Sequence, residues 1–263
     1  MAYTPSLFRV SKYGKYLSYY MEFMKRGDFQ SVSAAVKYVL FKQLPRRQRV
    51  VTTRMGTFRF REGTTDFQFA NFSYENEIKK YLAQIVPDIG LFIDIGACIG
   101  EYAIWLSRQG IRSIAIEPVN HTAIRENIAL NNINPAYIKV LNCAVGNTNK
   151  KVSFHVLEGV TSSSYINESE AGDIDCRKLD DLVDLRDIDP EKTTVIKLDV
   201  EGMELEVLEG AEQLIRQVKN LQIVYEYCSC GDPAIRALLD RYATFSYRDL
   251  DGVNTLAVKK YEV

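Results

Sequence analysis

Three carboxylates and a lysine gather where an apolar run gives way to a turn in the second half of the chain. The run leads to Lys197 and Asp199, and Glu201 and Glu204 follow closely. This pattern predicts a strand that ends at Asp199 and a helix that begins near Glu204. In open α/β sheets, ligands bind at the carboxyl ends of the strands. Carboxylates there can take a proton from a substrate, position it or hold a hard cation.

A second corner of this kind lies upstream, where the sequence reads D-I-G-A-C-I-G from Asp94 to Gly100. Gly96 permits a tight turn, and Gly100 lets the following helix approach the strand, so that backbone N–H groups from Ala97 onward face a ligand. Cys98 replaces the middle glycine of the dinucleotide fingerprint, which makes a pyrophosphate fit less well. Asp94 favours a cation or a hydroxyl group instead of a phosphate.

Two further segments fit an adenosine ligand. Glu117 and Pro118 close the next predicted strand, and an acid there can accept both ribose hydroxyls. Cys143 and Ala144 close the third strand, where small residues suit an adenine. The sulfonium and ammonium charges of S-adenosylmethionine (SAM) favour carboxylates, whereas NAD favours backbone amides. An adenosine site beside Asp94 therefore predicts SAM as the cofactor.

The acidic corner would then carry the chemistry. Asp199 faces the reacting centre, while Glu201 and Glu204 support it by positioning a substrate. Lys197 is expected to keep Asp199 ionised. We expect both Lys197 and Glu226, at the end of a later strand, to contact the substrate. Two alternatives stay open: the acids only stabilise a helix N-terminus, or they hold a divalent metal ion that nothing else in the sequence demands.

Taken together, the motifs resemble the FkbM-type SAM-dependent methyltransferases over about residues 71–227. The resemblance rests on D-I-G-A-C-I-G (94–100), E-P (117–118), N-I-A-L-N-N (127–132), N-C-A-V-G-N (142–147), the serine run 162–164 and I-K-L-D-V-E-G-M-E (196–204). The family commonly has Asn where this chain has Cys98, so a side-chain contact to the cofactor would be lost there.

The resemblance implies an α/β, Rossmann-like class I methyltransferase fold. Its seven-stranded, mostly parallel sheet has helices on both faces and an antiparallel last strand pair. It also implies methyl transfer from SAM, usually to a hydroxyl of a sugar, glycan or natural product. The segment 63–75 looks like the family's entry segment, which packs over the cofactor and makes Tyr74 a cofactor contact. Ser163, in the serine run, becomes a substrate candidate.

Periodicity predicts an N-terminal extension over residues 1–70 and a methyltransferase domain over 71–263. The extension would hold helices over 10–24 and 32–40, the second capped by Ser31, and a hairpin over 50–61. After a helix over 71–85, strands and helices alternate. We expect a single strand over 137–145, a mobile loop over 159–172 and one helix over 203–217.

Charge is distributed unevenly. Residues 1–50 hold ten Lys or Arg against two acids, a net charge of +8, and the remaining residues carry −9. The chain as a whole, at −1, is not a polyanion binder, so we expect no nucleic-acid partner. The basic region fits an acceptor, a carrier or a peripheral contact with an anionic membrane, or simply a solvated surface. The oligomeric state is not predicted.

The five cysteines are an odd number, and no signal peptide or apolar stretch long enough to span a membrane stands in the sequence. We therefore expect a cytoplasmic protein with free thiols.

Three other classes of protein are alternatives to this interpretation. An NAD-dependent oxidoreductase would need a Tyr-x-x-x-Lys pair, and the only such spacing, Tyr38 and Lys42, lies far upstream of the glycine corner. A nucleic-acid amino-methyltransferase would need prolines at the Asp199 corner. A SAM-binding interaction module without catalysis would be expected to lose the glycine corner, which is present.

Overall fold

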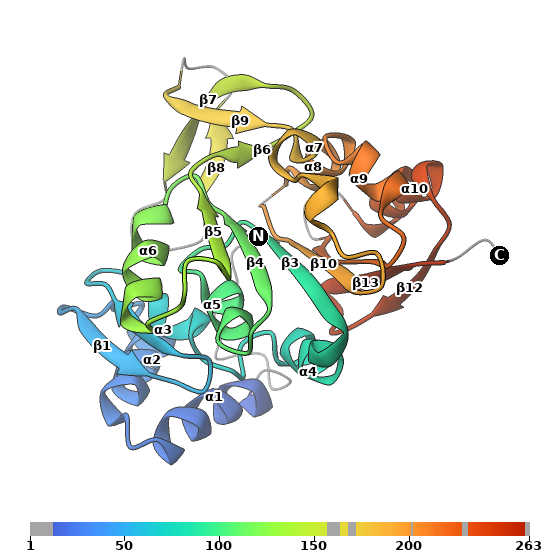
Figure 1. Ribbon diagram of the computed structural model, residues 1–263. Coiled ribbons are helices and arrows are strands. Elements are labelled where there is room, and N and C mark those ends of the chain that lie inside the picture. The colour runs from blue at the N-terminus through green and yellow to red at the C-terminus, as the bar shows by residue number, and fades with distance from the viewer. Residues whose placement is uncertain (1–12, 157–163, 168–171, 201, 228–230, 261–263) are drawn as a thin grey trace.

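The computed structural model describes residues 13–156, 164–167, 172–200, 202–227 and 231–260. A seven-stranded sheet runs through the centre of the protein in the order β12-β13-β11-β10-β3-β4-β5 (Figure 1). Its strands are β3 (Ile89–Ile95), β4 (Arg112–Ile116), β5 (Ile138–Leu141), β10 (Thr193–Leu198), β11 (Leu221–Glu226), β12 (Phe245–Asp249) and β13 (Asn254–Lys259). The strand β13 runs in the direction opposite to the other six. The predicted sheet with its antiparallel last pair is confirmed.

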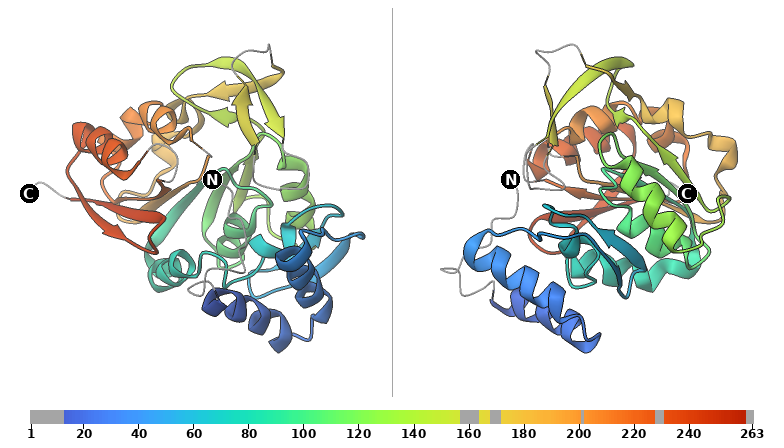
Figure 2. Two further views of the ribbon diagram at one scale, coloured as in Figure 1. Left: turned by 180° about the vertical axis from the view of Figure 1, so that it is seen from behind. Right: turned by 90° about the vertical axis from the view of Figure 1, so that its left-hand side faces the viewer.

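Helices cover both faces of this sheet and bury two apolar cores (Figure 2). One core contains side chains of α4 (Asn76–Ile85), α5 (Glu101–Ser107) and α6 (His121–Leu130). The other contains side chains of α7 (Leu179–Leu182), α8 (Glu204–Glu209), α9 (Glu212–Gln217) and α10 (Asp232–Tyr242). A short 3-10 helix, η2 (Val86–Asp88), leads into β3, and a second one, η3 (Leu185–Asp187), follows α7. The central strands of the seven-stranded sheet are buried on both faces, and their sequences are therefore nearly continuous apolar runs.

The N-terminal extension comprises α1 (Tyr13–Lys25), α2 (Phe29–Phe41), the hairpin β1 (Arg49–Thr52) and β2 (Thr57–Phe60), and α3 (Asp66–Phe69). The side chain of Asp28 accepts a hydrogen bond from the Ser31 amide and caps α2. The prediction that Ser31 is the cap is therefore wrong, because the helix begins one turn earlier.

The hairpin is attached to the rest of the protein by two asparagines, Asn127 of α6 and Asn131, which comes directly after this helix. Asn131 Oδ1 accepts a hydrogen bond from the Thr57 amide at 2.9 Å, and Asn127 Oδ1 accepts one from the Arg59 amide at 2.8 Å. Phe58 lies in the same apolar core as the residues of α5. These contacts show what the N-I-A-L-N-N motif does in this fold. The division at residue 70 stays a prediction.

A smaller sheet of four strands in the order β6-β9-β7-β8 projects from the carboxyl end of β5 (Figures 1 and 2). Its strands are β6 (Ala144–Val145), β7 (Lys150–Val156), β8 (Ser164–Asn167) and β9 (Ile174–Arg177). The expected single strand over 137–145 is divided between the two sheets. The expected loop over 159–172 is wrong for 164–167, because these residues pair antiparallel with β7 and satisfy its backbone groups.

The expected helix over 203–217 is also divided, into α8 and α9, at Gly210. A Cβ at this position would overlap the carbonyl oxygen of Gly146, so the break brings the two backbones into contact. Within the part of the chain that the structure describes, none of the helices has the length and hydrophobicity of a transmembrane span.

Candidate active site

The glycine corner joins β3 to α5 and turns against the end of β4. Gly96 and Gly100 have φ angles of +82° and +81°, in the region that glycine adopts without strain. The amides of Gly96 and Ala97 donate to the carbonyl oxygen of Ile116 at 3.0 and 3.2 Å. A Cβ at Gly96 would overlap the carbonyl oxygen of Asp199. The glycine corner is therefore packed closely against the ends of β4 and β10. The expectation that the Ala97 amide faces a ligand is wrong, because this amide is bonded to Ile116.

Glu117 closes β4 and is held by backbone amides. Its Oε1 accepts hydrogen bonds from Val119 and Asn120, and its Oε2 accepts one from Cys98, all at 2.9 Å. Burial raises the pKa of Glu117, and these amides oppose the rise. Cys98 has a φ of +50°, a conformation that asparagine tolerates better than most residues, which gives a backbone reason for the family's usual Asn.

The N-terminal extension reaches this end of the site through Arg61. Its guanidinium forms an ion pair with the fully buried Asp66, at 2.9 Å, and donates to Asn120 Oδ1 at 2.7 Å. The backbone amide of Asn120 donates a hydrogen bond to the carboxylate of Glu117. The segment that follows β2 is thus fixed beside the ribose-binding candidate.

Asp94 and Lys197 stand opposite each other in the register of β3 and β10, and both are buried. Lys197 Nζ donates to Asp199 Oδ2 at 3.0 Å. Asp94 Oδ2 is buried and, among the described residues, lacks a hydrogen-bond partner. Burial raises the pKa of Asp94 to about 7, opposed by the charge of Lys197. The structure therefore brings these three predicted residues together.

Four residues that the sequence did not single out complete this buried cluster. Glu75 accepts a hydrogen bond from the Tyr102 hydroxyl at 2.7 Å and lies 4.0 Å from Lys197 Nζ. Glu101 has an Oε2 without a hydrogen-bond partner in the described chain, and burial raises its pKa. Lys79 is fully buried, and burial lowers its pKa. Glu75 belongs to the predicted entry segment, whereas Glu101 and Lys79 look like surface residues of helices.

Lys79 ties down the segment that precedes α4. Its Nζ donates to the carbonyl oxygens of Tyr74 at 2.7 Å, Asn71 at 2.9 Å and Phe69 at 3.5 Å. The ring of Tyr74 packs edge-on against Phe69 and Tyr19. This arrangement holds Tyr74 and Glu75 beside the Asp94 cluster, and the contact of Tyr74 with the cofactor stays a prediction.

The other predicted residues are less closely grouped. Glu204 is buried at the start of α8, where its Oε1 accepts a hydrogen bond from the Gly202 amide at 3.1 Å. Glu226 ends β11, opposite Asn254 of β13. Cys143 and Ala144 are buried in separate apolar clusters, and Pro118 follows Glu117 at the surface of the corner. Their predicted roles are untested by this geometry.

Glu201 and Ser163 lie outside the described residues. Within the described ranges, no three His, Cys, Asp or Glu side chains are arranged to hold a metal ion. Because Glu201 is outside those ranges, the metal alternative stays open. Three of the cysteines, Cys98, Cys143 and Cys176, are buried free thiols.

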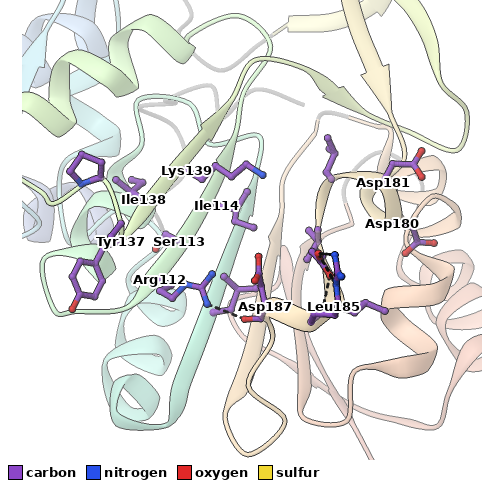
Figure 3. A pocket seen from close by; sticks show the side chains of 17 residues that line it. Arg112, Ser113, Ile114, Tyr137, Ile138, Lys139, Asp180, Asp181, Leu185 and Asp187 are labelled. Atoms are coloured by element: carbon purple, nitrogen blue, oxygen red, sulfur yellow. Dashed lines mark hydrogen bonds and ion pairs between the residues drawn. The ribbon is translucent and has the colours of Figure 1, made fainter.

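A cavity of 540 Å³ lies elsewhere, at the amino ends of β4 and β5 (Figure 3). It is lined by Arg112, Tyr137, Asp187 and neighbouring residues. Arg112 begins the strand that Glu117 follows, so this cavity and the glycine corner lie at opposite ends of the sheet. It contributes nothing to the site.

The fold and the site define a class I methyltransferase. Residues 94–247 match the methyltransferase FkbM domain, and the chain belongs to this family. No curated protein sequence is similar enough to match.

Solved structures with a similar fold include three methyltransferases. The 16S rRNA N2 G1207 methyltransferase RsmC of T. thermophilus, in complex with AdoMet and guanosine, is 12% identical, with a TM-score of 0.47 and coverage of 83% of this chain and 52% of that one. The N-terminal domain of human METTL16 with SAH is 14% identical, with a TM-score of 0.45 and coverage of 96% and 92%. The Pyrococcus abyssi tRNA (uracil-54, C5)-methyltransferase with S-adenosyl-L-homocysteine is 12% identical, with a TM-score of 0.43 and coverage of 80% and 43%.

This chain thus spans about half the length of the tRNA and rRNA enzymes. Similarities this distant say nothing of the acceptor.

The cofactor of this family member is SAM, and the residues present fit it. Glu117 stands where a ribose is expected, and the buried Asp94 Oδ2, which has no hydrogen-bond partner among the described residues, suits a cationic group. Family membership excludes the NAD-dependent alternative.

Proposed function

We propose that the protein transfers the methyl group of SAM to a hydroxyl of a small-molecule, sugar or glycan acceptor, with Asp199 as the base. The observation that carries this proposal is the Lys197–Asp199 contact at the end of β10. Lys197 Nζ donates to one carboxylate oxygen of Asp199, while the Asp199 side chain remains 29% exposed. An anchored but accessible carboxylate is suited to receive a proton from an incoming acceptor.

The reaction places specific demands on these residues. Bound SAM supplies an electrophilic methyl group on a sulfonium. Asp199 would orient the acceptor hydroxyl toward that methyl group and would take its proton when the methyl group passes from sulfur to the acceptor oxygen. Lys197 holds the carboxylate in place by its hydrogen bond. Asp94 and Glu117 hold the cationic and ribose portions of the cofactor.

Further acids fit supporting roles in the same proposal. The acceptor would be contacted by Glu201, Glu204, Glu226 and Ser163. The reaction would need no nucleic acid and would take place in the cytoplasm, with residues 1–50 contacting the acceptor or its carrier. The net charge of −1 supports the absence of a nucleic-acid partner.

The substitution Asp199→Asn tests the proposal, because it keeps the shape of the side chain and removes the base. We expect kcat to fall by about 10²–10⁴, with SAM affinity nearly unchanged. Methyl transfer to a panel of glycans and hydroxylated small molecules would be followed by intact mass, with and without EDTA. Asp173→Asn, at an exposed position directly before β9, serves as the control.

A parent-like rate in Asp199→Asn would overturn the assignment of the base. Loss of turnover in EDTA, restored by Mg²⁺, would favour the metal alternative at the acidic corner.

A further inference from the structure

The outer surface of the first two helices carries an unusual concentration of exposed apolar side chains. Eight large apolar side chains are exposed in the described part of the chain, and six of them lie on α1 and α2. These six are Leu17, Met21, Met24, Phe29, Leu40 and Phe41, with Phe29 69% and Phe41 72% exposed. Single exposed apolar residues are normal, but a cluster on adjoining elements indicates an interaction surface.

The spacing of these residues places them on the outer sides of the two helices. Leu17, Met21 and Met24 follow helical spacing on α1, on the side away from the buried Phe23. Phe29 and Leu40 are three turns apart on α2, on the side away from the buried Ala35. The two helices pack side by side at the N-terminal end of the ribbon (Figures 1 and 2). Their outer sides form what we call the helical face.

Basic side chains accompany the apolar ones. Lys25, Lys37, Arg46 and Arg47 are exposed. None of these four forms an ion pair with a described residue, whereas Arg26 and Arg49 are paired with Glu22 and Asp28. The helical face and the loop after α2 therefore present unneutralised positive charge beside apolar groups.

We propose that the helical face docks on an anionic lipid bilayer. Apolar side chains on one side of a helix, bordered by lysine and arginine, are the features with which interfacial helices insert among lipid headgroups. A second copy of the chain fits less well, because a twofold contact would set this positive surface against itself. The net charge of +8 over residues 1–50 complements an anionic surface.

Docking in this orientation would also place α1 between the bilayer and the entry segment. The carbonyl oxygens of Tyr19 and Ser18 accept hydrogen bonds from the side chains of Asn71 and Ser73, at 3.2 and 3.3 Å. The same segment carries Tyr74 and Glu75 of the site. The docking surface is therefore linked directly to the residues over the cofactor, although docking itself requires no methyl transfer.

Vesicle binding of the full chain without SAM tests the proposal. The protein would be sedimented with vesicles of phosphatidylcholine alone or mixed with phosphatidylserine, at low and high salt. We expect binding only to the phosphatidylserine vesicles, and less of it at high salt. The double variant Phe29→Ser and Phe41→Ser should lower the partition coefficient by about tenfold or more, because two large apolar groups no longer insert. The triple variant Lys37→Gln, Arg46→Gln and Arg47→Gln should weaken binding and its salt dependence together.

Tyr137→Ser is the matched control, since Tyr137 is exposed but lies outside the two helices. It should bind vesicles like the parent, and thermal melting should show all the variants folded. The proposal is overturned if the parent ignores anionic vesicles, or if the double variant binds them as well as the parent. A concentration-dependent dimer that the double variant abolishes would assign the helical face to a second copy instead. SAM binding and turnover would be measured in separate experiments. The outcome of the vesicle experiment therefore does not depend on whether the proposed function is correct.

Discussion

The carbonyl oxygen of Asp199 occupies the space beside Gly96 that a Cβ would need. The corner after β3 and the corner after β10 are therefore in backbone contact, and the Asp199 amide in turn donates to the carbonyl oxygen of Ile95 at 3.1 Å. This contact fixes the proposed base relative to the proposed cofactor site. A side chain at position 96 would have to move both corners.

We predict that Gly96→Ala abolishes measurable SAM binding. Gly110→Ala is the matched control, because Gly110 has a φ of +84° but its added Cβ would meet nothing within 4 Å. Both variants should lose about 1–2 kcal/mol of stability from the left-handed backbone, yet only Gly96→Ala adds the overlap with Asp199. Chemical denaturation and calorimetry with SAM separate the two effects. Equal SAM affinity in both variants would contradict the role of the Gly96 corner.

Glu117→Ala should weaken SAM binding by about 1–3 kcal/mol, the scale of losing charged hydrogen bonds. The variant also leaves the amides of Cys98, Val119 and Asn120 without their acceptor, so some loss of stability is expected. An analogue of SAM that lacks the ribose hydroxyls distinguishes the ribose contact from this general damage. The parent should bind SAM more tightly than the analogue, and the variant should bind both alike. If the variant still discriminates between them, the ribose assignment is wrong.

The sheet and its two corners were predictable because apolar runs, glycines and acids occur in the order that an alternating α/β fold requires. Asp94 and Lys197 both belonged to predicted strand ends, and only the β3–β10 register was needed to bring them together. Glu101 and Lys79 were not predictable in this way. A charged residue in a helix is ordinarily a surface residue, and only tertiary packing shows that these two are buried.

The errors in the elements have similar physical origins. The strand β8 is only four residues long and follows a run of serines, so its Tyr and Ile were too short a signal, and its assignment depends on pairing with β7. The break between α8 and α9 falls at Gly210, which is only a weak local signal, and its contact with Gly146 is distant in the sequence. The start of α2 was misplaced because Asp28 and Ser31 are both good capping residues, and the choice depended on which of them lies outside the helix.

SAM affinity should rise as the pH is raised from about 6 to about 8. Burial raises the pKa of Asp94 to about 7, while Lys197 lowers it and the charges of Asp199 and Glu75 raise it further. Only the ionised carboxylate attracts the cationic end of SAM, so binding below this pKa must release a proton and loses about tenfold per pH unit. Calorimetry at several pH values, in buffers of different ionisation enthalpy, measures both the affinity and the proton release.

Asp94→Asn should bind SAM weakly, with an affinity that no longer changes over this pH range. Glu101→Gln removes the neighbouring buried acid, and its affinity should still rise with pH. The free protein should show the opposite trend in stability. Because the folded pKa of Asp94 lies above its usual 3.8, this group makes the protein less stable as the pH rises from about 4 to about 7. A flat affinity profile in the parent would contradict the role of Asp94.

Lys79→Met should destabilise the protein and weaken SAM binding, although Lys79 is not proposed to contact the cofactor. The ammonium group is the shared donor for the carbonyl oxygens of Phe69, Asn71 and Tyr74, and methionine keeps its length but offers no donor. Leaving buried carbonyl groups unpaired costs about 1–3 kcal/mol and frees the segment that carries Glu75. Lys80→Met is the matched control, because Lys80 is exposed on the same helix and forms only a surface ion pair with Glu77, worth about 0.5 kcal/mol. Urea denaturation and SAM titration of the two variants would be compared, and equal losses in both would show that Lys79 does not hold the entry segment in place.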